Sequence, residues 1–120
     1  MKNQKKILVA TEPALGATLY EKLRCEHITS IITCSAEYVL ENILTKKEID
    51  CIIITIDFAG RDNGVYLMNK LCLNEKTKII FLAPDLSDKT FEKCKHPQAK
   101  MIMLPLNESS YQTIKDIVAG

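Results

Sequence analysis

The chain has 120 residues, 47% of them hydrophobic, and its 16 lysines and arginines against 15 aspartates and glutamates give a net charge of +1. This length is typical of one domain, and the balanced charge argues against direct nucleic-acid binding, which needs a concentrated basic surface. No apolar run is long enough to span a bilayer, and the basic N-terminus is followed by an apolar stretch too short for a signal peptide. We therefore expect a cytoplasmic protein without membrane contacts.

Short aliphatic runs alternate along the chain with segments of helical periodicity. The strongest strand signal is the nearly continuous apolar run 51–56, as expected for a strand covered on both faces, and a polar loop, 57–63, follows it. The expected strands span residues 7–10, 28–34, 51–56, 78–83 and 101–104. The expected helices begin near Pro13, Ser35, Gly64, Ser87 and either Asn107 or Ser109.

Five strands that alternate strictly with five helices predict an α/β domain over residues 1–120. We expect a three-layer, doubly wound parallel sheet of the flavodoxin-like type, with strand order 2-1-3-4-5. In such sheets, functional residues lie beyond the carboxyl ends of the strands. The candidates for a functional site are therefore the residues at the ends of the first, third, fourth and fifth strands.

Cysteine usage favours reduced thiols that serve as small hydrophobic side chains. The count of five is odd, and no two cysteines form a Cys-x-x-Cys pair. The cysteines lie in apolar surroundings at positions Cys25, Cys34, Cys51, Cys72 and Cys94. The sequence therefore predicts no disulfide framework.

At the expected strand ends, the sequence resembles the receiver domain of two-component response regulators. The run 7–13, ILVATEP, looks like the family's ILVVDDEP, and the run 49–56, IDCIIITI, is similar to its PDLVLLDI. The runs 78–84 and 101–106 resemble its PVIVLTA and YLPKPF blocks. The resemblance implies a site with a Mg²⁺-binding acidic pair, a phosphoacceptor Asp, a Thr or Ser and a Lys, which together stabilise phosphoryl transfer.

This chain departs from the receiver pattern at nearly every one of those positions, and of the acidic pair it keeps one carboxylate, that of Glu12. Thr11 and Glu12 stand at the acidic pair, Thr55 at the phosphoacceptor, Ala83 at the Thr/Ser position and Leu104 at the Lys position. A threonine hydroxyl is not activated without an adjacent base, and one carboxylate is a poor Mg²⁺ site. We expect a degenerate pseudo-receiver that is not an enzyme, binds no cofactor or metal, and has a former phosphate pocket made apolar and closed by Ala83 and Leu104.

The resemblance also implies how such a domain acts. Receivers contact partners through the face of the fourth helix, fifth strand and fifth helix. In this chain that face corresponds to Phe91, Lys93, Met101, Met103, Tyr111 and Lys115. The expected partner is another protein, an effector domain attached in a longer regulator, or a second copy of the chain.

Two other functions stay open at this stage. Asp57 lies two residues beyond Thr55 and would serve as a displaced phosphoacceptor, with Mg²⁺ as cofactor, if the domain were phosphorylated. A small molecule could instead bind in the cleft at the strand ends. Two Cys-x-His pairs, at positions 25–27 and 94–96, follow the first and fourth helices; in a receiver-like fold these helices cover opposite faces, which disfavours a shared zinc site.

Overall fold

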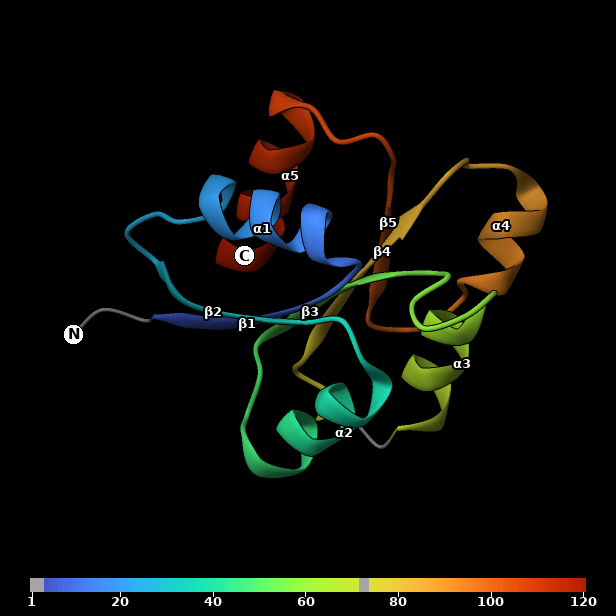
Figure 1. The fold of residues 1–120 in the computed structure, drawn as a ribbon. Helices are drawn as coiled ribbons and strands as arrows, with labels where there is room; N and C mark the ends of the chain where they lie inside the picture. The colour runs from blue at the N-terminus through green and yellow to red at the C-terminus, as the bar shows by residue number, and fades with distance from the viewer. Residues whose placement is uncertain (1–3, 72–73) are drawn as a thin grey trace.

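The computed structural model describes residues 4–71 and 74–120 and contains one parallel sheet with strand order β2-β1-β3-β4-β5 (Figure 1). All neighbouring strands in this sheet run parallel, and each strand is followed by a helix. The predicted fold class and strand order are therefore confirmed. Within the described residues, no helix combines the length and the apolar character that crossing a bilayer requires.

The strands and helices follow the predicted order closely. The strands are β1 (Lys5–Ala10), β2 (Ile28–Cys34), β3 (Cys51–Thr55), β4 (Lys78–Ala83) and β5 (Ala99–Met103). The helices are α1 (Pro13–Lys22), α2 (Glu37–Lys46), α3 (Asn63–Lys70), α4 (Asp88–Lys93) and α5 (Glu108–Ala119). Boundaries shift by one or two residues at most strands, and the predicted bounds of β2 and β4 are those of the structure.

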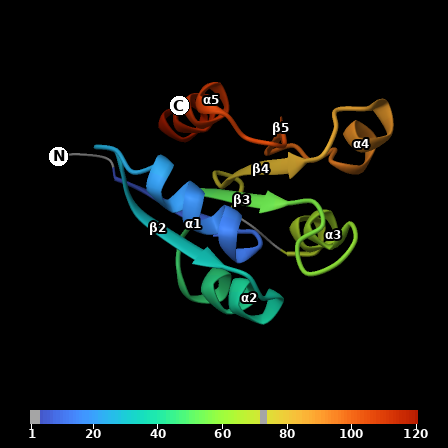
Figure 2. The ribbon, with the colours of Figure 1, turned by 45° about the horizontal axis from the view of Figure 1, so that its top comes forward.

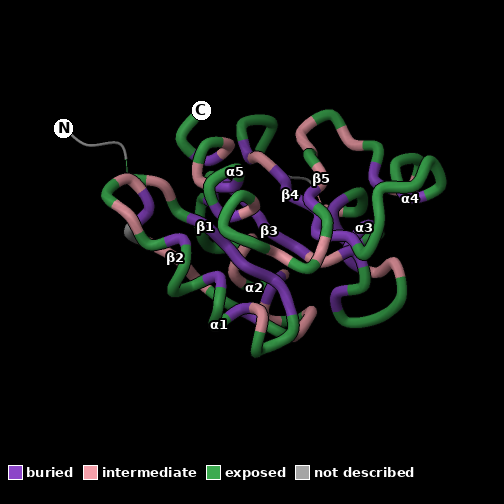
Figure 3. The backbone as a smooth tube through the Cα atoms, turned by 90° about the horizontal axis from the view of Figure 1, so that it is seen from above, coloured by how far each residue is buried: buried purple, intermediate pink, exposed green. Residues whose placement is uncertain are grey.

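Helices cover both faces of the sheet, as Figures 1 and 2 show: α1 and α5 lie together on one face, and α2 and α3 lie on the other. Alternate side chains of a strand point to opposite faces, so each strand contributes to two apolar layers. In β3, Ile53 packs in the layer beneath α1 and α5, while Ile52 and Ile54 pack in the layer beneath α2 and α3. The central strands β1, β3 and β4 are buried along most of their length (Figure 3).

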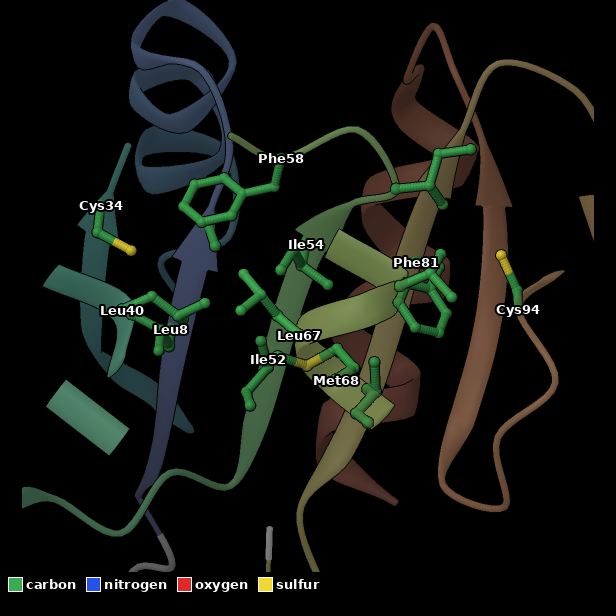
Figure 4. Close-up of a cluster of buried hydrophobic side chains, with 14 of the residues drawn as sticks. Leu8, Cys34, Leu40, Ile52, Ile54, Phe58, Leu67, Met68, Phe81 and Cys94 are labelled. Carbon is green, nitrogen blue, oxygen red and sulfur yellow. The ribbon is translucent and has the colours of Figure 1, made fainter. Parts of the chain in front are cut away.

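The loop that follows β3 contains a buried aromatic residue that the sequence pattern did not predict. Phe58 is only 3% exposed, although it lies within the stretch 57–63 that was expected to be a polar loop. Its ring joins the layer beneath α2 and α3, together with Cys34, Ile54 and Leu67 (Figure 4). The expectation of a wholly polar loop is therefore wrong. Burial of the Phe58 ring stabilises the loop against the sheet.

Two helix starts illustrate how local side chains set the element boundaries. At α5, the Asn107 side chain accepts a hydrogen bond from the Ser110 amide, and the Ser110 hydroxyl accepts one from the Asn107 amide. This reciprocal pair shows that Asn107, and not the alternative Ser109, is the N-cap of α5. At α2, the expected cap Ser35 is wrong: Ala36 occupies that position without a side-chain hydrogen bond, and the acidic Glu37 in the first turn complements the helix dipole instead.

The beginning of α3 approaches the end of β3 very closely at Gly64. A Cβ atom at this position would lie 2.1 Å from the Thr55 carbonyl oxygen and 3.1 Å from that of Ile56. The Gly64 amide also donates a hydrogen bond of 2.9 Å to the Ile56 carbonyl oxygen. Only glycine fits here, so this contact fixes the path of the loop between β3 and α3.

Buried thiols are part of both apolar layers. Cys34, Cys51 and Cys94 are buried free cysteines, Cys25 is a half-buried one, and Cys72 lies outside the described residues. Burial raises the pKa of Cys34 to about 11 and that of Cys51 to about 12, and it also raises the pKa of Cys94. At neutral pH these thiols stay protonated and poorly reactive, which agrees with their predicted role as small hydrophobic side chains.

The contact at Gly64 yields a stability prediction. Gly64→Ala should lower the free energy of unfolding by about 2–3 kcal/mol, because the new methyl group meets rigid backbone oxygen atoms. Gly16→Ala in α1 is the control, since its new Cβ meets the Thr11 side chain at 3.1 Å. Urea unfolding followed by circular dichroism measures both changes, and a Gly64 variant as stable as the Gly16 variant would contradict the assigned contact.

Candidate functional site

An open cleft of about 510 Å³ lies at the carboxyl ends of the strands, where the sequence placed a functional site. Five of the predicted site residues line it, namely Thr11, Glu12, Thr55, Asp57 and Leu104, whereas the sixth, Ala83, does not. The remaining lining residues are Pro13, Ser35, Ile56, Phe58, Ala59, Leu82 and Pro84. The structure therefore brings five of the six predicted positions together, although they lie at or just beyond the ends of β1, β3 and β5, in distant parts of the sequence.

The β1 end of the cleft is organised by hydrogen bonds that stabilise helix α1. Both carboxylate oxygens of Glu12 accept hydrogen bonds from the first turn of the helix, at 2.7 Å from the Leu15 amide and 3.2 Å from the Ala14 amide. The buried Thr11 hydroxyl donates to the Glu12 carbonyl oxygen at 2.9 Å. The carboxylate predicted as a remnant metal ligand is thus the N-cap of α1.

Thr55 and Asp57 occupy different places at the β3 end. Thr55 is the last residue of β3, is half-buried, and pairs with Leu82 of β4. Asp57 is exposed in the loop, where its carboxylate accepts a hydrogen bond of 2.8 Å from the Asp62 amide. Asp62 has a left-handed backbone with φ of 58°, and the Asp57 carboxylate stabilises this tight turn. The carboxylate of Asp62 in turn lies 3.3 Å from the ammonium group of Lys93 in α4.

The β4 and β5 ends supply no polar side chain to the cleft. Ala83 is fully buried, and its carbonyl oxygen accepts a hydrogen bond of 2.8 Å from the Leu104 amide. Leu104 is half-buried against the cleft and precedes Pro105 through a cis peptide bond. The expectation that Ala83 and Leu104 close the former pocket is wrong, because an open cleft remains beside Leu104. Its β4 and β5 side is apolar as expected, formed by Leu82, Pro84 and Leu104.

The charge of this cleft is negative. Among its described lining residues, Glu12 and Asp57 are acidic, and there is no lysine or arginine. Fixed cations or a bound divalent ion normally stabilise a phosphoryl group in such a site. No group of three or more potential metal-binding side chains occurs within residues 4–71 and 74–120.

The residues predicted for a partner face differ in accessibility. Phe91 of α4 and Met103 of β5 are 50% and 48% exposed. Tyr111, by contrast, is only 9% exposed: its ring belongs to the layer beneath α1 and α5, and the Lys22 ammonium group lies 5.8 Å from its centre. The prediction that Tyr111 belongs to an exposed face is therefore wrong, because the first turn of α5 directs its ring into the core. Met101 is half-buried against the opposite layer.

Two further predicted residues of that face are lysines. Lys115 is half-buried on α5, and Lys93 forms the ion pair with Asp62 described above. Lys93 therefore ties α4 to the loop after β3. The two Cys-x-His pairs lie on opposite faces, as expected, since Cys25 packs in the layer beneath α1 and α5 and Cys94 packs in the other.

Solved structures of other proteins share this architecture. A response regulator from Thermotoga maritima matches with a TM-score of 0.79 at 16% identity, covering 98% of this chain and 99% of its own. A response regulator receiver protein from Burkholderia phymatum matches with a TM-score of 0.77 at 17% identity, covering 97% and 96%. A CheY-like receiver domain from Methylobacillus flagellatus matches with a TM-score of 0.70 at 14% identity, covering 96% and 98%. This is the fold of response-regulator receiver domains.

The likeness to receivers lies in the fold. No protein-family model matches this chain, and no curated protein matches it. Because one fold supports many functions, the function has to be argued from the side chains in the cleft.

Three residues at this receiver-fold site were not singled out from the sequence. Phe58 and Ser35 line the cleft, and Asp62 anchors both the loop and α4. A large apolar residue within an otherwise polar stretch is the signal that would have identified Phe58. Ser35 was expected only as a helix cap, and its place in the cleft, like the contact of Asp62 with α4, depends on distant segments of the chain.

The loop between β4 and α4 of this receiver fold contains an acidic residue with a perturbed pKa. The Thr90 hydroxyl donates a hydrogen bond of 2.6 Å to the Asp85 carboxylate, and the Ser87 amide donates another of 3.0 Å. These bonds, with that of Thr90 the larger cause, lower the pKa of Asp85 from its ordinary value of 3.8 to about 2.

The lowered pKa of Asp85 predicts how the start of α4 responds to acid. A carboxylate with a depressed pKa stabilises the fold above pH 4, and this contribution is lost as the pH falls through about 2. The NMR shift of the Thr90 amide should follow that titration. In Asp85→Asn this step should be missing, and an unchanged step in the variant would contradict the assignment.

Proposed function

We propose that this domain is a phosphorylation-independent pseudo-receiver that acts in signal transduction through protein–protein contacts. The observation that carries the proposal is the charge of the cleft. Its described lining has two carboxylates and no lysine or arginine, and a leucine stands at the position of the receiver's lysine. In this proposal the domain is not an enzyme and needs no cofactor. Its buried, protonated thiols fit the reducing cytoplasm, where we place it.

Electrostatics argue against a phosphoryl group in this cleft. A phosphoryl group brings about two negative charges, which here would face Glu12 and Asp57. Leu104 offers neither charge nor hydrogen bonds, and Ala83 has no hydroxyl to donate. Phosphoryl transfer gains its rate from positioned positive charge, so these side chains remove the main source of stabilisation.

Metal binding would also compete with bonds that the fold uses. The Glu12 carboxylate already accepts two amide hydrogen bonds at the start of α1, and the Asp57 carboxylate holds the Asp62 turn. Mg²⁺ demands a near-octahedral set of oxygen ligands and loses its waters reluctantly. A cation in the cleft would therefore compete with these hydrogen bonds for the carboxylate oxygen atoms.

The altered side chains also affect switching. In receivers, a Thr or Ser moves toward the phosphoryl group and an aromatic residue of the fifth strand follows; here these positions are Ala83 and Met101. A ligand shifts a conformational equilibrium only by its differential affinity for the two states. Without phosphoryl contacts, the exposed apolar groups of Phe91 and Met103 are presented to a partner constitutively.

The alternative is a phosphorylatable receiver that uses Asp57. One observation favours it: Asp57 is exposed in the same cleft as Glu12, so a carboxylate nucleophile is accessible there. Its Oδ1 atom accepts the hydrogen bond of the Asp62 amide, so the other carboxylate oxygen would be the attacking atom. The two functions predict opposite results with small phosphodonors.

Incubation with acetyl phosphate and Mg²⁺ should leave the mass of the protein unchanged, because the cleft provides no cation for the phosphoryl group. Intact-mass spectrometry measures this, with a phosphorylatable receiver as the positive control. A phosphate adduct on the parent protein that disappears in Asp57→Asn would replace our proposal with the alternative. Asp57→Asn retains a side-chain oxygen that can accept the Asp62 hydrogen bond, so the loop is preserved.

Adding Mg²⁺ and beryllofluoride, a phosphoryl mimic, should not change the conformation of the domain. Amide NMR spectra with and without the mimic should coincide at Thr55, Met101 and Met103, since Ala83 and Met101 lack the hydroxyl and the aromatic ring of the receiver switch. Changes that spread from Thr55 and Asp57 to Met101 would show that the switch of ordinary receivers is intact. Magnesium alone is the control for nonspecific ionic effects.

A further inference from the structure

The turn between α1 and β2 places a cysteine beside a histidine, in one of the two Cys-x-His pairs of the sequence. The sulfur atom of Cys25 lies 3.6 Å from Nδ1 of His27 and 3.9 Å from Nε2. A neutral imidazole has one nitrogen without hydrogen, and at these distances either nitrogen can accept the thiol proton. Cys25 and His27 therefore combine a nucleophile with a base, far from the cleft at the other end of the strands.

Backbone hydrogen bonds hold this pair of side chains in place. Cys25 and Ile28 exchange two such bonds, of 3.4 Å and 3.1 Å, which close the turn. The Lys5 amide donates a third bond, of 2.9 Å, to the carbonyl oxygen of His27. The turn is thereby attached to the first residues of both β1 and β2, so the folded backbone keeps the thiol and the imidazole together.

The second Cys-x-His pair shows that the spacing alone does not produce this arrangement. Cys94 is only 5% exposed and packs in the layer beneath α2 and α3. The Nδ1 atom of His96 accepts a hydrogen bond of 3.1 Å from the Gln98 amide, so this ring stabilises the turn before β5. His96 therefore serves as a matched control for His27.

Cys25 is also the most accessible thiol in residues 4–71 and 74–120. It is half-buried, whereas Cys34, Cys51 and Cys94 are buried. Burial raises the pKa of each of these three thiols, which keeps them protonated and unreactive. Access to solvent and a neighbouring base thus coincide at one cysteine.

We propose that Cys25 is a modification site that forms a mixed disulfide with a low-molecular-weight disulfide, with His27 as the base. His27 takes the thiol proton while the Cys25 sulfur attacks one sulfur atom of the reagent. The new S–S bond joins Cys25 to one half of the reagent. The other half leaves as a thiolate and takes up the proton from the His27 imidazolium.

The electrons of this exchange balance without a further oxidant. Cys25 is oxidised, and the half of the reagent that leaves is reduced to a thiol. The sulfur of Cys25 packs at the border of the layer beneath α1 and α5, and this half-buried position favours a slender open-chain reagent over the disulfide of a folded protein. The inference goes beyond the proposed function and does not depend on it.

Peptide mapping of the full reduced chain after incubation with oxidised glutathione tests the site. The first mixed disulfide should form on Cys25, and it should form about tenfold faster than on the three buried cysteines. In concentrated urea this difference should shrink, because unfolding exposes every thiol. An adduct that forms first on Cys72 or on a buried cysteine, or all sites reacting alike in the folded protein, overturns the proposal.

The role of His27 is tested by the rate of the same reaction in two variants. His27→Gln should slow modification of Cys25 about tenfold, because glutamine cannot take up the thiol proton. His96→Gln should leave that rate unchanged, and circular dichroism should show both variants folded. A variant that merely loosened the turn would expose Cys25 and react faster, so an equal or higher rate in His27→Gln contradicts the assignment. None of these readouts involves the cleft, and failure here leaves the proposed function intact.

Discussion

The approach of α3 to the end of β3 is the constraint on which the site depends. With the Gly64 Cβ position only 2.1 Å from the Thr55 carbonyl oxygen, the helix can begin there only because no side chain is present. The loop between the two elements must then turn sharply, which it does with left-handed residues at Ala59 and Asp62. This path directs Phe58 into the core and leaves the Asp57 carboxylate at the cleft.

The cleft keeps the position of a receiver site while its polar groups serve the fold. Glu12 stabilises the first turn of α1, and Asp57 stabilises a turn of its own loop. Carboxylates that accept amide hydrogen bonds gain local stability but lose freedom to coordinate an ion. The acidic residues at these two strand ends therefore have structural roles of their own, whatever chemistry the cleft performs.

The sequence predicted the fold far better than the details of the site. Aliphatic runs and helical periods are local signals, and they located β2 and β4 to the residue. The burial of Phe58 and Tyr111 depends on how loops and helices dock onto the sheet, which no local pattern encodes. The prediction that Leu104 closes the pocket was wrong for the same reason. The identity of a side chain does not determine how far the neighbouring loops lie from it.

The pairing of α1 with α5 has a consequence for how the chain folds. Lys22 near the end of α1 reaches Glu108 at the start of α5, a separation of 86 residues, and Tyr111, Ile114 and Val118 complete the layer over β3 and β4. The opposite layer draws its helices from the middle of the chain. Contacts of such long sequence separation close slowly. During synthesis, the part of this face that α5 covers stays exposed until the last helix has emerged from the ribosome, and its apolar side chains need protection for that interval.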